Sequence, residues 1–164
     1  MNPSPSGFFN DPQSKLGPSP MEMQRYLGKI SGPLLDRIDI HIEVEAVPFE
    51  KLADRTPAES SEAIRERVTV ARVSQQKRFE ELENTHYNAQ MSSRQIRKYC
   101  VLDAASTQLL KSAMERLSLS ARAYDRILKV ARTIADLEGE DEVSQNHIAE
   151  AIQYRSLDRD GWLG

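Results

Sequence analysis

The sequence contains a single cysteine, and this scarcity excludes two kinds of stabilising site. Cys100 cannot form a disulfide within one chain, and one thiol with three scattered histidines cannot supply the four ligands of a structural zinc site. No run approaches the roughly 18 apolar residues of a membrane-spanning helix, and the N-terminus lacks the basic-then-apolar pattern of a signal peptide. The sequence therefore predicts a cytoplasmic protein with no metal site and no membrane partner.

Catalytic motifs are equally scarce. The sequence has no G-x-x-x-x-G-K-[ST] loop, the motif whose backbone cradles nucleotide phosphates, and no residue pattern typical of a nucleophile with its base. A net charge of -3 gives the chain no overall attraction to nucleic acid. We therefore expect the isolated chain neither to bind ATP tightly nor to hydrolyse it.

The first fifty residues combine a proline-rich loop with one strand pattern. Five of the eight prolines lie within residues 1–20, so this segment is predicted to be a loop. A short helix is expected over Met21–Ile30, with Pro20 favouring its start. Apolar and polar residues then alternate over Ile38–Val44, which is the period of a strand with one apolar face. Because a strand needs neighbours, we expect its sheet to be built by residues that precede Met1.

A long helix is predicted from Thr56 to about Leu82. Thr56 is a suitable N-cap, Pro57 suits the first helical position, and Glu59 completes a capping box. The apolar residues of this helix form a narrow stripe, and charges of alternating sign occupy most other positions. This pattern favours a connector or interface strut over a core helix or a DNA-binding stripe.

The rest of the chain predicts a compact helical bundle of about 60 residues, because apolar residues recur there at helical spacing. Good N-cap residues precede three of its helices, and Gly139 follows a helix end where a left-handed residue is favoured. The four expected helices are Ser93–Tyr99, Ala104–Leu117, Ala121–Leu137 and Gln145–Tyr154, and the three N-caps are Asp103, Ser120 and Ser144.

Arg37 lies between Asp36 and Asp39, on a turn that leads into the predicted strand. One interpretation is a local ion pair that fixes this turn. The other is an arginine finger, a side chain that reaches the γ-phosphate held by a neighbouring subunit and stabilises charge in the transition state. The residues alone leave both interpretations open.

Arg122 is predicted in the first turn of a helix, where the helix dipole disfavours a cation. An anion bound at that helix end would be held by both the dipole and the guanidinium, which favours a phosphate-binding role. The alternative is an exposed arginine beside Asp125 or Asp103. The other basic residues of this helix are interpreted mostly as a solvated face: Arg126, Lys129 and Arg132.

Several motifs of the chain belong together as a family pattern. They are Asn2-Pro3-Ser4-Pro5-Ser6-Gly7, Gln24–Leu27, Ile30–His41, Ser120–Ala123, Ala131–Leu137 and Glu150–Arg155. In residues and order they closely resemble the C-terminal part of the magnesium-chelatase-like AAA+ ATPases, and within these the bacterial ComM/YifB group. The resemblance covers essentially the whole chain.

The resemblance implies a role for three residues. Asn2 looks like the sensor-1 asparagine that orients the attacking water, Arg37 like the arginine finger, and Arg122 like the sensor-2 arginine of the helical lid. The long helix looks like the family's insertion that repositions the lid. Members use ATP and Mg²⁺, form hexameric rings, and in the ComM type are associated with DNA branch migration during natural transformation.

Together these observations predict a mainly α-helical chain: a helical lid bundle, a long linking helix and a short α/β remnant of an AAA+ core with one clear strand. Residues 1–47 would be the core remnant, 48–91 the linker with the inserted helix, and 92–164 the lid. The expected partners are the N-terminal AAA+ core, neighbouring subunits of a homo-oligomeric ring, and DNA through the parent protein.

A second function class stays open at this point. The chain could instead be a stand-alone helical adaptor that binds a partner protein and has no role in ATP hydrolysis. Within the first class, the parent could act on DNA or insert a metal into a porphyrin.

Overall fold

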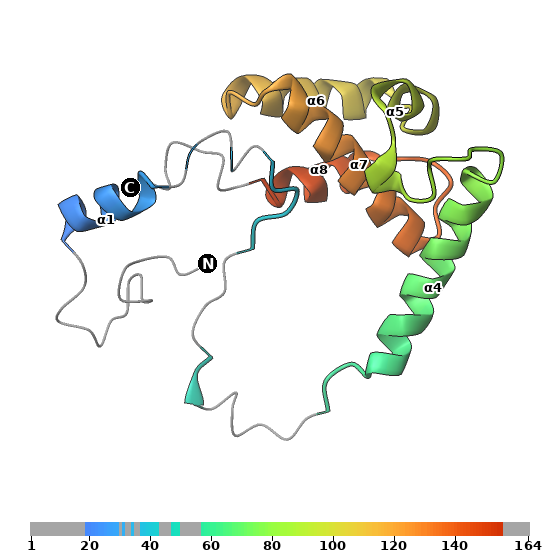
Figure 1. Cartoon of the computed structure of the whole chain (residues 1–164), viewed down its shortest axis with the longest axis horizontal. Coiled ribbons are helices and arrows are strands. Elements are labelled where there is room, and N and C mark those ends of the chain that lie inside the picture. The colour runs from blue at the N-terminus through green and yellow to red at the C-terminus, as the bar shows by residue number, and fades with distance from the viewer. Residues whose placement is uncertain are drawn as a thin grey trace.

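The computed structural model describes residues 19–29, 31, 34, 37–42, 47–49 and 57–155, and its regular elements there are helices (Figure 1). A first helix, α1 (Pro20–Leu27), stands apart from the others. The remaining elements are α4 (Ser61–Arg78), the short 3-10 helix η1 (Asn88–Gln90), α5 (Ser93–Tyr99), α6 (Ala104–Arg116), α7 (Ala121–Glu138) and α8 (Gln145–Gln153). The predicted mainly helical fold class is confirmed. None of the described helices is long and apolar enough to cross a membrane.

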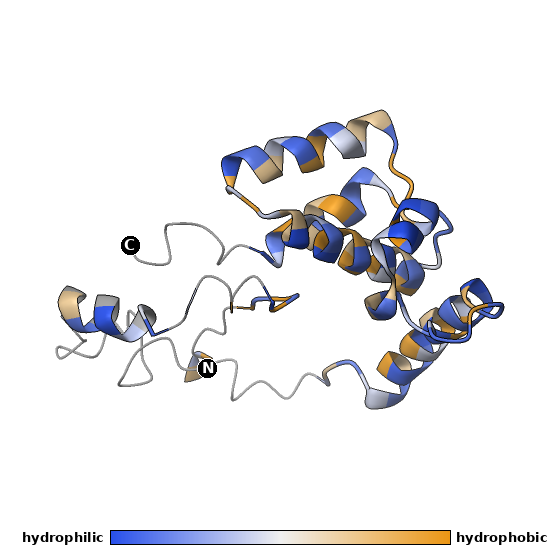
Figure 2. Cartoon of the chain, turned by 45° about the horizontal axis from the view of Figure 1, so that its top comes forward, coloured by the Kyte–Doolittle hydropathy of each residue, from blue (hydrophilic) through white to orange (hydrophobic). Residues whose placement is uncertain are grey.

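Helix α7 is the centre of the bundle. It packs against α4, α5, α8 and η1, and α6 packs against α8. Residues spaced by four along α7, namely Ala123, Ile127, Ala131 and Ala135, are fully buried, and the small alanines allow neighbouring helices to approach closely. Hydrophobic and hydrophilic residues alternate along the bundle helices, as expected for amphipathic helices (Figure 2). The buried apolar core consists of Phe79, Met91, Ile96, Cys100, Leu110, Ile127, Leu128, Ala131, Ile134, Val143, Ile148 and Ala151.

The helix ends follow the local signals in the sequence. Asp103 Oδ1 accepts a hydrogen bond of 2.7 Å from the backbone of α6, and Ser120 Oγ accepts one of 3.2 Å from the backbone of α7. Ser144 is the N-cap of α8, and Gly139 ends α7 in the left-handed conformation with φ 78°. These predictions are confirmed. The caps could be predicted because each depends only on residues within one helical turn.

The predicted start of the long helix is wrong. Its N-cap is Ser60, whose hydroxyl accepts a hydrogen bond of 3.2 Å from the Ala63 backbone, whereas Thr56 lies outside the described residues. Glu59 does not close a capping box. Its carboxylate instead accepts a hydrogen bond of 2.7 Å from Arg67 at the surface. Serine and threonine are both favoured N-cap residues, so Ser60 is as good a candidate for the start of this helix as Thr56, four residues earlier.

The N-terminal half of α4 extends away from the bundle (Figure 1). Every residue from 57 to 70 is exposed, and burial against α7 begins at Ala71. The exposed half includes Ile64 and Val68, which continue along the helix the apolar stripe that is buried further on. This half therefore leaves an amphipathic face unpacked by the described residues.

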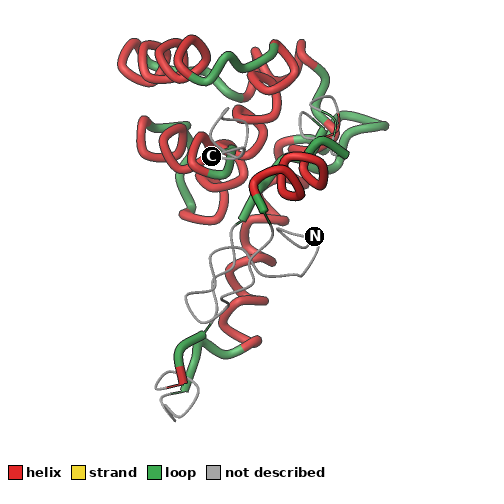
Figure 3. Tube along the Cα trace, turned by 90° about the vertical axis from the view of Figure 1, so that its left-hand side faces the viewer, coloured by secondary structure: helices red, strands yellow, loops and turns green. Residues whose placement is uncertain are grey.

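The predicted strand is not formed in the part of it that the structure describes, residues 38–42, and no strand is drawn among the described residues (Figure 3). The expected apolar face is also not buried, because the isoleucines of this segment are exposed and His41 is its buried residue. A strand requires backbone pairing with a neighbouring strand. Here the His41 N–H donates instead to the carbonyl of Tyr154, at 2.8 Å, after the end of α8. Val44 lies outside the described residues.

A buried charge network joins α4 to α7, and it corrects the prediction that Arg132 belongs to a solvated face. Arg132 and Asp136 are 1% and 2% exposed. Asp136 accepts hydrogen bonds from both Arg132 (3.1 Å) and Arg78 (2.8 Å), and from the Asn88 amide (2.7 Å). Burial lowers the pKa of Arg132, and the Asp136 carboxylate opposes that effect. One carboxylate thus balances two arginines that come from different helices.

Cys100 is buried in the core, and its Sγ lies 3.7 Å from the Leu128 carbonyl. Burial raises the pKa of this thiol to about 11, from 9.0. At pH 8 the folded chain should therefore react with a thiol reagent about 100-fold more slowly than the urea-unfolded chain, because the thiolate is the reacting form. The Cys100 thiol loses its proton at a lower pH in the unfolded chain than in the folded chain. The free energy of unfolding should therefore fall as the pH rises from about 9 to 11. Equal labelling rates for the folded and unfolded chains would contradict this.

Candidate functional site

The N-terminus of α7 carries positive charge and has no acidic residue in its first turn. Ser120 caps this end of the helix. The first turn does contain Arg122, whose side chain is exposed. The backbone N–H groups of this turn and the helix dipole add partial positive charge at the same end. This helix end is therefore suited to an anion.

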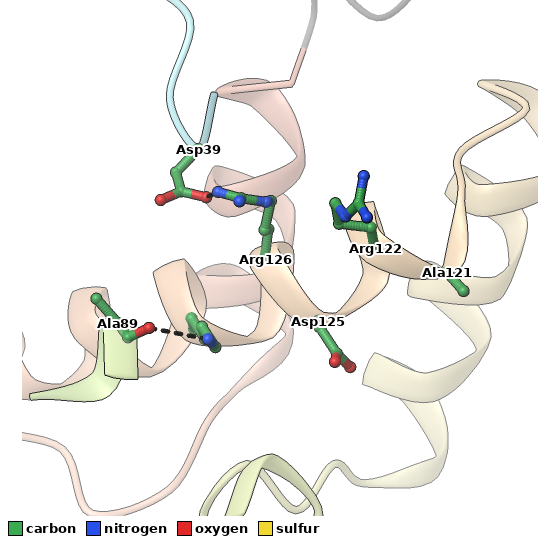
Figure 4. A pocket seen from close by; sticks show the side chains of 7 residues that line it. Asp39, Ala89, Ala121, Arg122, Asp125 and Arg126 are labelled. Carbon is green, nitrogen blue, oxygen red and sulfur yellow. Dashed lines mark hydrogen bonds and ion pairs between the residues drawn. The ribbon is translucent and has the colours of Figure 1, made fainter. Parts of the chain in front are cut away.

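Three basic side chains continue from this end along one face of α7. Arg122, Arg126 and Lys129 follow one another at intervals of four and three residues, which places them on the same side of a helix. They line an open pocket of about 510 Å³, together with Asp39, Ala89, Ala121 and Asp125. Figure 4 shows the residues of this pocket, with Arg122 and Arg126 on the same side of the helix.

Each charged group of the pocket has a different environment. Arg126 forms an ion pair with Asp39, and the two side chains are 26% and 51% exposed. Lys129 donates a hydrogen bond of 2.9 Å to the carbonyl of Ala89, drawn as a dashed line in Figure 4. Asp125 accepts one of 2.7 Å from the Ser93 hydroxyl.

Arg122 differs from the other cations of the pocket. Within the part of the chain that the structure describes, its guanidinium has neither a hydrogen bond nor an ion pair. Asp125 and Asp103, the two candidate neighbours in the sequence, have other partners: Asp125 contacts Ser93, and Asp103 caps α6. Arg122 therefore keeps all of its donors available for a ligand.

The segment that carries Arg37 lies against the bundle beside this pocket. Asp39 contacts Arg126, and the carbonyl of Ile38 accepts a hydrogen bond from Arg155. Arg37 itself is exposed on a turn, and its backbone N–H donates to the Leu34 carbonyl at 3.0 Å. The fold thus brings the two arginines singled out in the sequence into the same region, 85 positions apart in the chain.

Sequence reasoning found some members of this site and missed others. Arg122 lines the pocket, whereas Asn2 lies outside the described residues. Arg126 and Lys129 were expected on a solvated face, although their helical spacing from Arg122 was a signal that could have grouped them with it. Asp39 was considered only as a partner of Arg37, and its ion pair with Arg126 depends on the tertiary fold.

The chemistry of the pocket suits a phosphate group. Its cations outnumber its carboxylates, and a guanidinium can bind two phosphate oxygens at once. No Ser, Thr, Cys or His side chain lines it. Among the described residues, no three His, Cys, Asp or Glu side chains are grouped closely enough to hold a metal ion. The pocket can therefore bind and orient an anion, and a metal would need ligands from elsewhere.

Comparison with known proteins assigns the chain to a family. The family model of the magnesium chelatase subunit ChlI C-terminal domain matches residues 58–155, and that of magnesium chelatase subunit ChlI matches residues 1–52. The chain belongs to the magnesium chelatase ChlI family. The first match covers α4 to α8 and six of the seven residues that line the pocket, and the second covers the segment that carries Arg37 and the seventh, Asp39.

Curated relatives agree with this assignment. The chain is 41% identical over 162 residues to the competence protein ComM of Haemophilus influenzae, and 40% and 39% identical over 160 residues to the uncharacterized proteins YifB of Salmonella typhimurium and Escherichia coli. These alignments cover 97% of the chain but about 30% of each relative. The chain therefore spans less than a third of the length of these relatives, and it is homologous to one segment of a ComM/YifB-type protein.

Proposed function

We propose that this chain is the lid-bearing part of a cytoplasmic magnesium-chelatase-like ATPase that works as a hexameric ring. The observation that carries the proposal is the pocket at the N-terminus of α7, where an arginine without a partner among the described residues faces an open, cation-rich cavity. Membership of the ChlI family and the homology to ComM and YifB support it.

In this proposal Arg122 binds the nucleotide from the lid. It lies on the first turn of a helix that is capped by Ser120 and buried at Ala123 and Ile127, so its guanidinium is close to where the dipole also favours an anion. ATP, bound with Mg²⁺ mainly by the AAA+ core, supplies the phosphoryl group that is transferred to water. Arg122 contributes charge and orientation, and the chain alone would neither bind ATP tightly nor hydrolyse it.

Two further residues take part in the proposed reaction. Arg37 would act as the arginine finger on the nucleotide of the neighbouring subunit, and its exposed position on a turn fits a side chain that reaches outwards. Asn2 would orient the attacking water. The ring would use the released energy on DNA, in branch migration during competence, a role suggested by the resemblance to the ComM type and by the word competence in the name of the Haemophilus influenzae relative.

The adaptor alternative has one observation in its favour, the exposed amphipathic half of α4. Ile64 and Val68 are 41% and 45% exposed there, and such a face suits contact with another protein surface. The same feature also fits a ring, in which α4 would lie between the lid and another part of the assembly. Because the family models match both the α4–α8 region and the segment before it, we favour the ATPase.

Replacing Arg122 with alanine tests the lid contact. In the complete ATPase, meaning this chain joined to its AAA+ core, Arg122→Ala should weaken ATP binding about 10- to 100-fold, because a hydrogen bond to a charged group is worth about 1.5–3 kcal/mol. ATP turnover should fall with it. Binding is measured by calorimetry and turnover by phosphate release.

The matched control is Arg116→Ala, which removes an exposed arginine from the last turn of α6 that does not line the pocket. This variant should bind ATP as the unmodified protein does. If Arg122→Ala also binds ATP normally, Arg122 is a surface residue and the proposed lid contact is wrong.

A further inference from the structure

The structure assigns a phosphate-binding role to two more residues of the pocket: we propose that Arg126 and Lys129 bind the polyphosphate chain beside Arg122, and that Asp39 is an internal anion that leaves Arg126 when the polyphosphate arrives. The inference rests on the proposed function, because it extends the same nucleotide site. It adds a class of ligand, an extended polyphosphate, and an exchange of carboxylate for phosphate.

The spacing of the three cations favours an extended anion. Arg122 and Lys129 are seven residues apart on α7, which corresponds to about 10 Å along the helix axis. Arg126 lies between them on the same face, and all three line the one pocket (Figure 4). A chain of phosphates matches cations spaced over that length better than a single phosphate does.

The present partners of Arg126 and Lys129 are replaceable. In the ion pair of Arg126 with Asp39, the Asp39 side chain is half exposed. Exposed ion pairs contribute little to stability, about 0–1 kcal/mol. Lys129 is bound to a neutral carbonyl, that of Ala89, which leaves two of its three donor protons available. A polyphosphate brings more negative charge than one carboxylate, so it should win the competition for both cations.

Asp39 is suited to this exchange by its position. It lies two residues after Arg37, on the segment that rests against α7 and α8. The other pocket carboxylate, Asp125, is on α7 itself and accepts a hydrogen bond from Ser93. Arg126 is paired with Asp39 and not with Asp125. Polyphosphate bound to the lid would therefore release one of the contacts that hold the Arg37 segment on the bundle.

The test is titration of this 164-residue chain with inorganic tripolyphosphate at low ionic strength, followed by calorimetry and by the backbone NMR signals of α7. Arg126→Gln and Lys129→Gln should each weaken binding about tenfold, in line with a lost charge-assisted hydrogen bond. Asp39→Asn should strengthen binding about threefold or more, because Arg126 is then free before the ligand arrives.

Two controls separate a specific exchange from overall charge. Arg116→Gln removes one exposed cation outside the pocket and should leave the affinity unchanged. Asp125→Asn removes the other pocket carboxylate. The gain from Asp39→Asn should vanish in the Arg126→Gln background, whereas any gain from Asp125→Asn should persist there. Thermal unfolding confirms that each variant is folded, and Arg126→Met, which keeps an unbranched side chain but removes the charge, replaces Arg126→Gln if that variant does not fold.

The outcomes distinguish this inference from the proposed function. If Arg126→Gln and Lys129→Gln bind tripolyphosphate as tightly as Arg116→Gln, or if the unmodified chain gives no binding at millimolar concentrations, the inference is wrong. The lid contact of Arg122 would then still be decided by ATP binding in the complete ATPase. If the two variants weaken binding but Arg122→Gln does not, the polyphosphate site stands and the assignment of Arg122 fails.

Discussion

Replacing Arg37 with alanine in the complete ATPase should reduce ATP hydrolysis by about 10³–10⁵-fold while leaving ATP affinity and folding nearly unchanged. An arginine finger acts on charge that develops in the transition state, so its loss lowers turnover more than ground-state binding. The side chain is exposed and outside the apolar core, so the substitution leaves no cavity. Phosphate release measures turnover, and calorimetry measures ATP affinity.

Arg37→Lys separates the geometry of the guanidinium from its charge. Lysine keeps the positive charge but presents it as a compact point instead of a planar fork, so we expect it to recover little of the lost activity. Full recovery in Arg37→Lys would mean that only the charge matters. A loss of stability in Arg37→Ala would instead favour the local ion pair that the sequence left as an alternative.

Mixed rings of the proposed ATPase test whether Arg37 acts between subunits. Arg37→Ala subunits are combined with subunits that lack the phosphate-binding lysine of the AAA+ core, so that neither kind is active alone. A mixed ring can place an intact Arg37 opposite an intact phosphate-binding loop, and activity should then return. If subunit exchange is demonstrated and no activity returns, Arg37 does not act on the neighbour's nucleotide.

Local signals in the sequence predicted the helices well. The bounds of α5 agree with the prediction at both ends, and the caps at Asp103, Ser120 and Gly139 are where the sequence indicated them. Each of these features is decided within one turn of helix, by a side chain and the nearby backbone. The start of α4 was missed because Ser60 and Thr56 are both good caps, and tertiary contacts begin only at Ala71.

Features that depend on distant residues could not be predicted. The alternation after Arg37 indicates a strand, but a strand forms only with a partner, and in the described residues this segment contacts Tyr154 instead. The charge of Arg132 suggests solvent exposure, yet Arg132 is buried beside Asp136, whose second arginine partner, Arg78, lies 58 positions before Asp136 in the sequence. The same limit applies to the ion pair of Asp39 with Arg126, which joins residues 87 positions apart.

The second large effect is expected at Asp136. Replacing this residue with alanine should lower the free energy of unfolding by about 3–5 kcal/mol, because it leaves Arg78 and Arg132 without their shared carboxylate. It also removes one of the two acceptors of the side-chain amide of Asn88, a residue that is 1% exposed. Urea unfolding followed by circular dichroism measures the change. Glu115→Ala, an exposed acidic residue on α6, should change stability by less than about 0.5 kcal/mol.

Salt and a compensating variant identify the cause of that loss. The loss of stability in Asp136→Ala should persist in 1 M salt, where the screening length is about 3 Å. Salt screens this interaction little, because Arg132 and Asp136 are buried and lie within hydrogen-bond distance of each other. Replacing all three charges with apolar residues, Arg78→Met, Arg132→Met and Asp136→Leu, should be less destabilising than Asp136→Ala alone, since no buried charge is then left without a partner. A loss below about 1 kcal/mol for Asp136→Ala would mean that water reaches the two arginines, and that the contact between α4 and α7 depends on apolar packing alone.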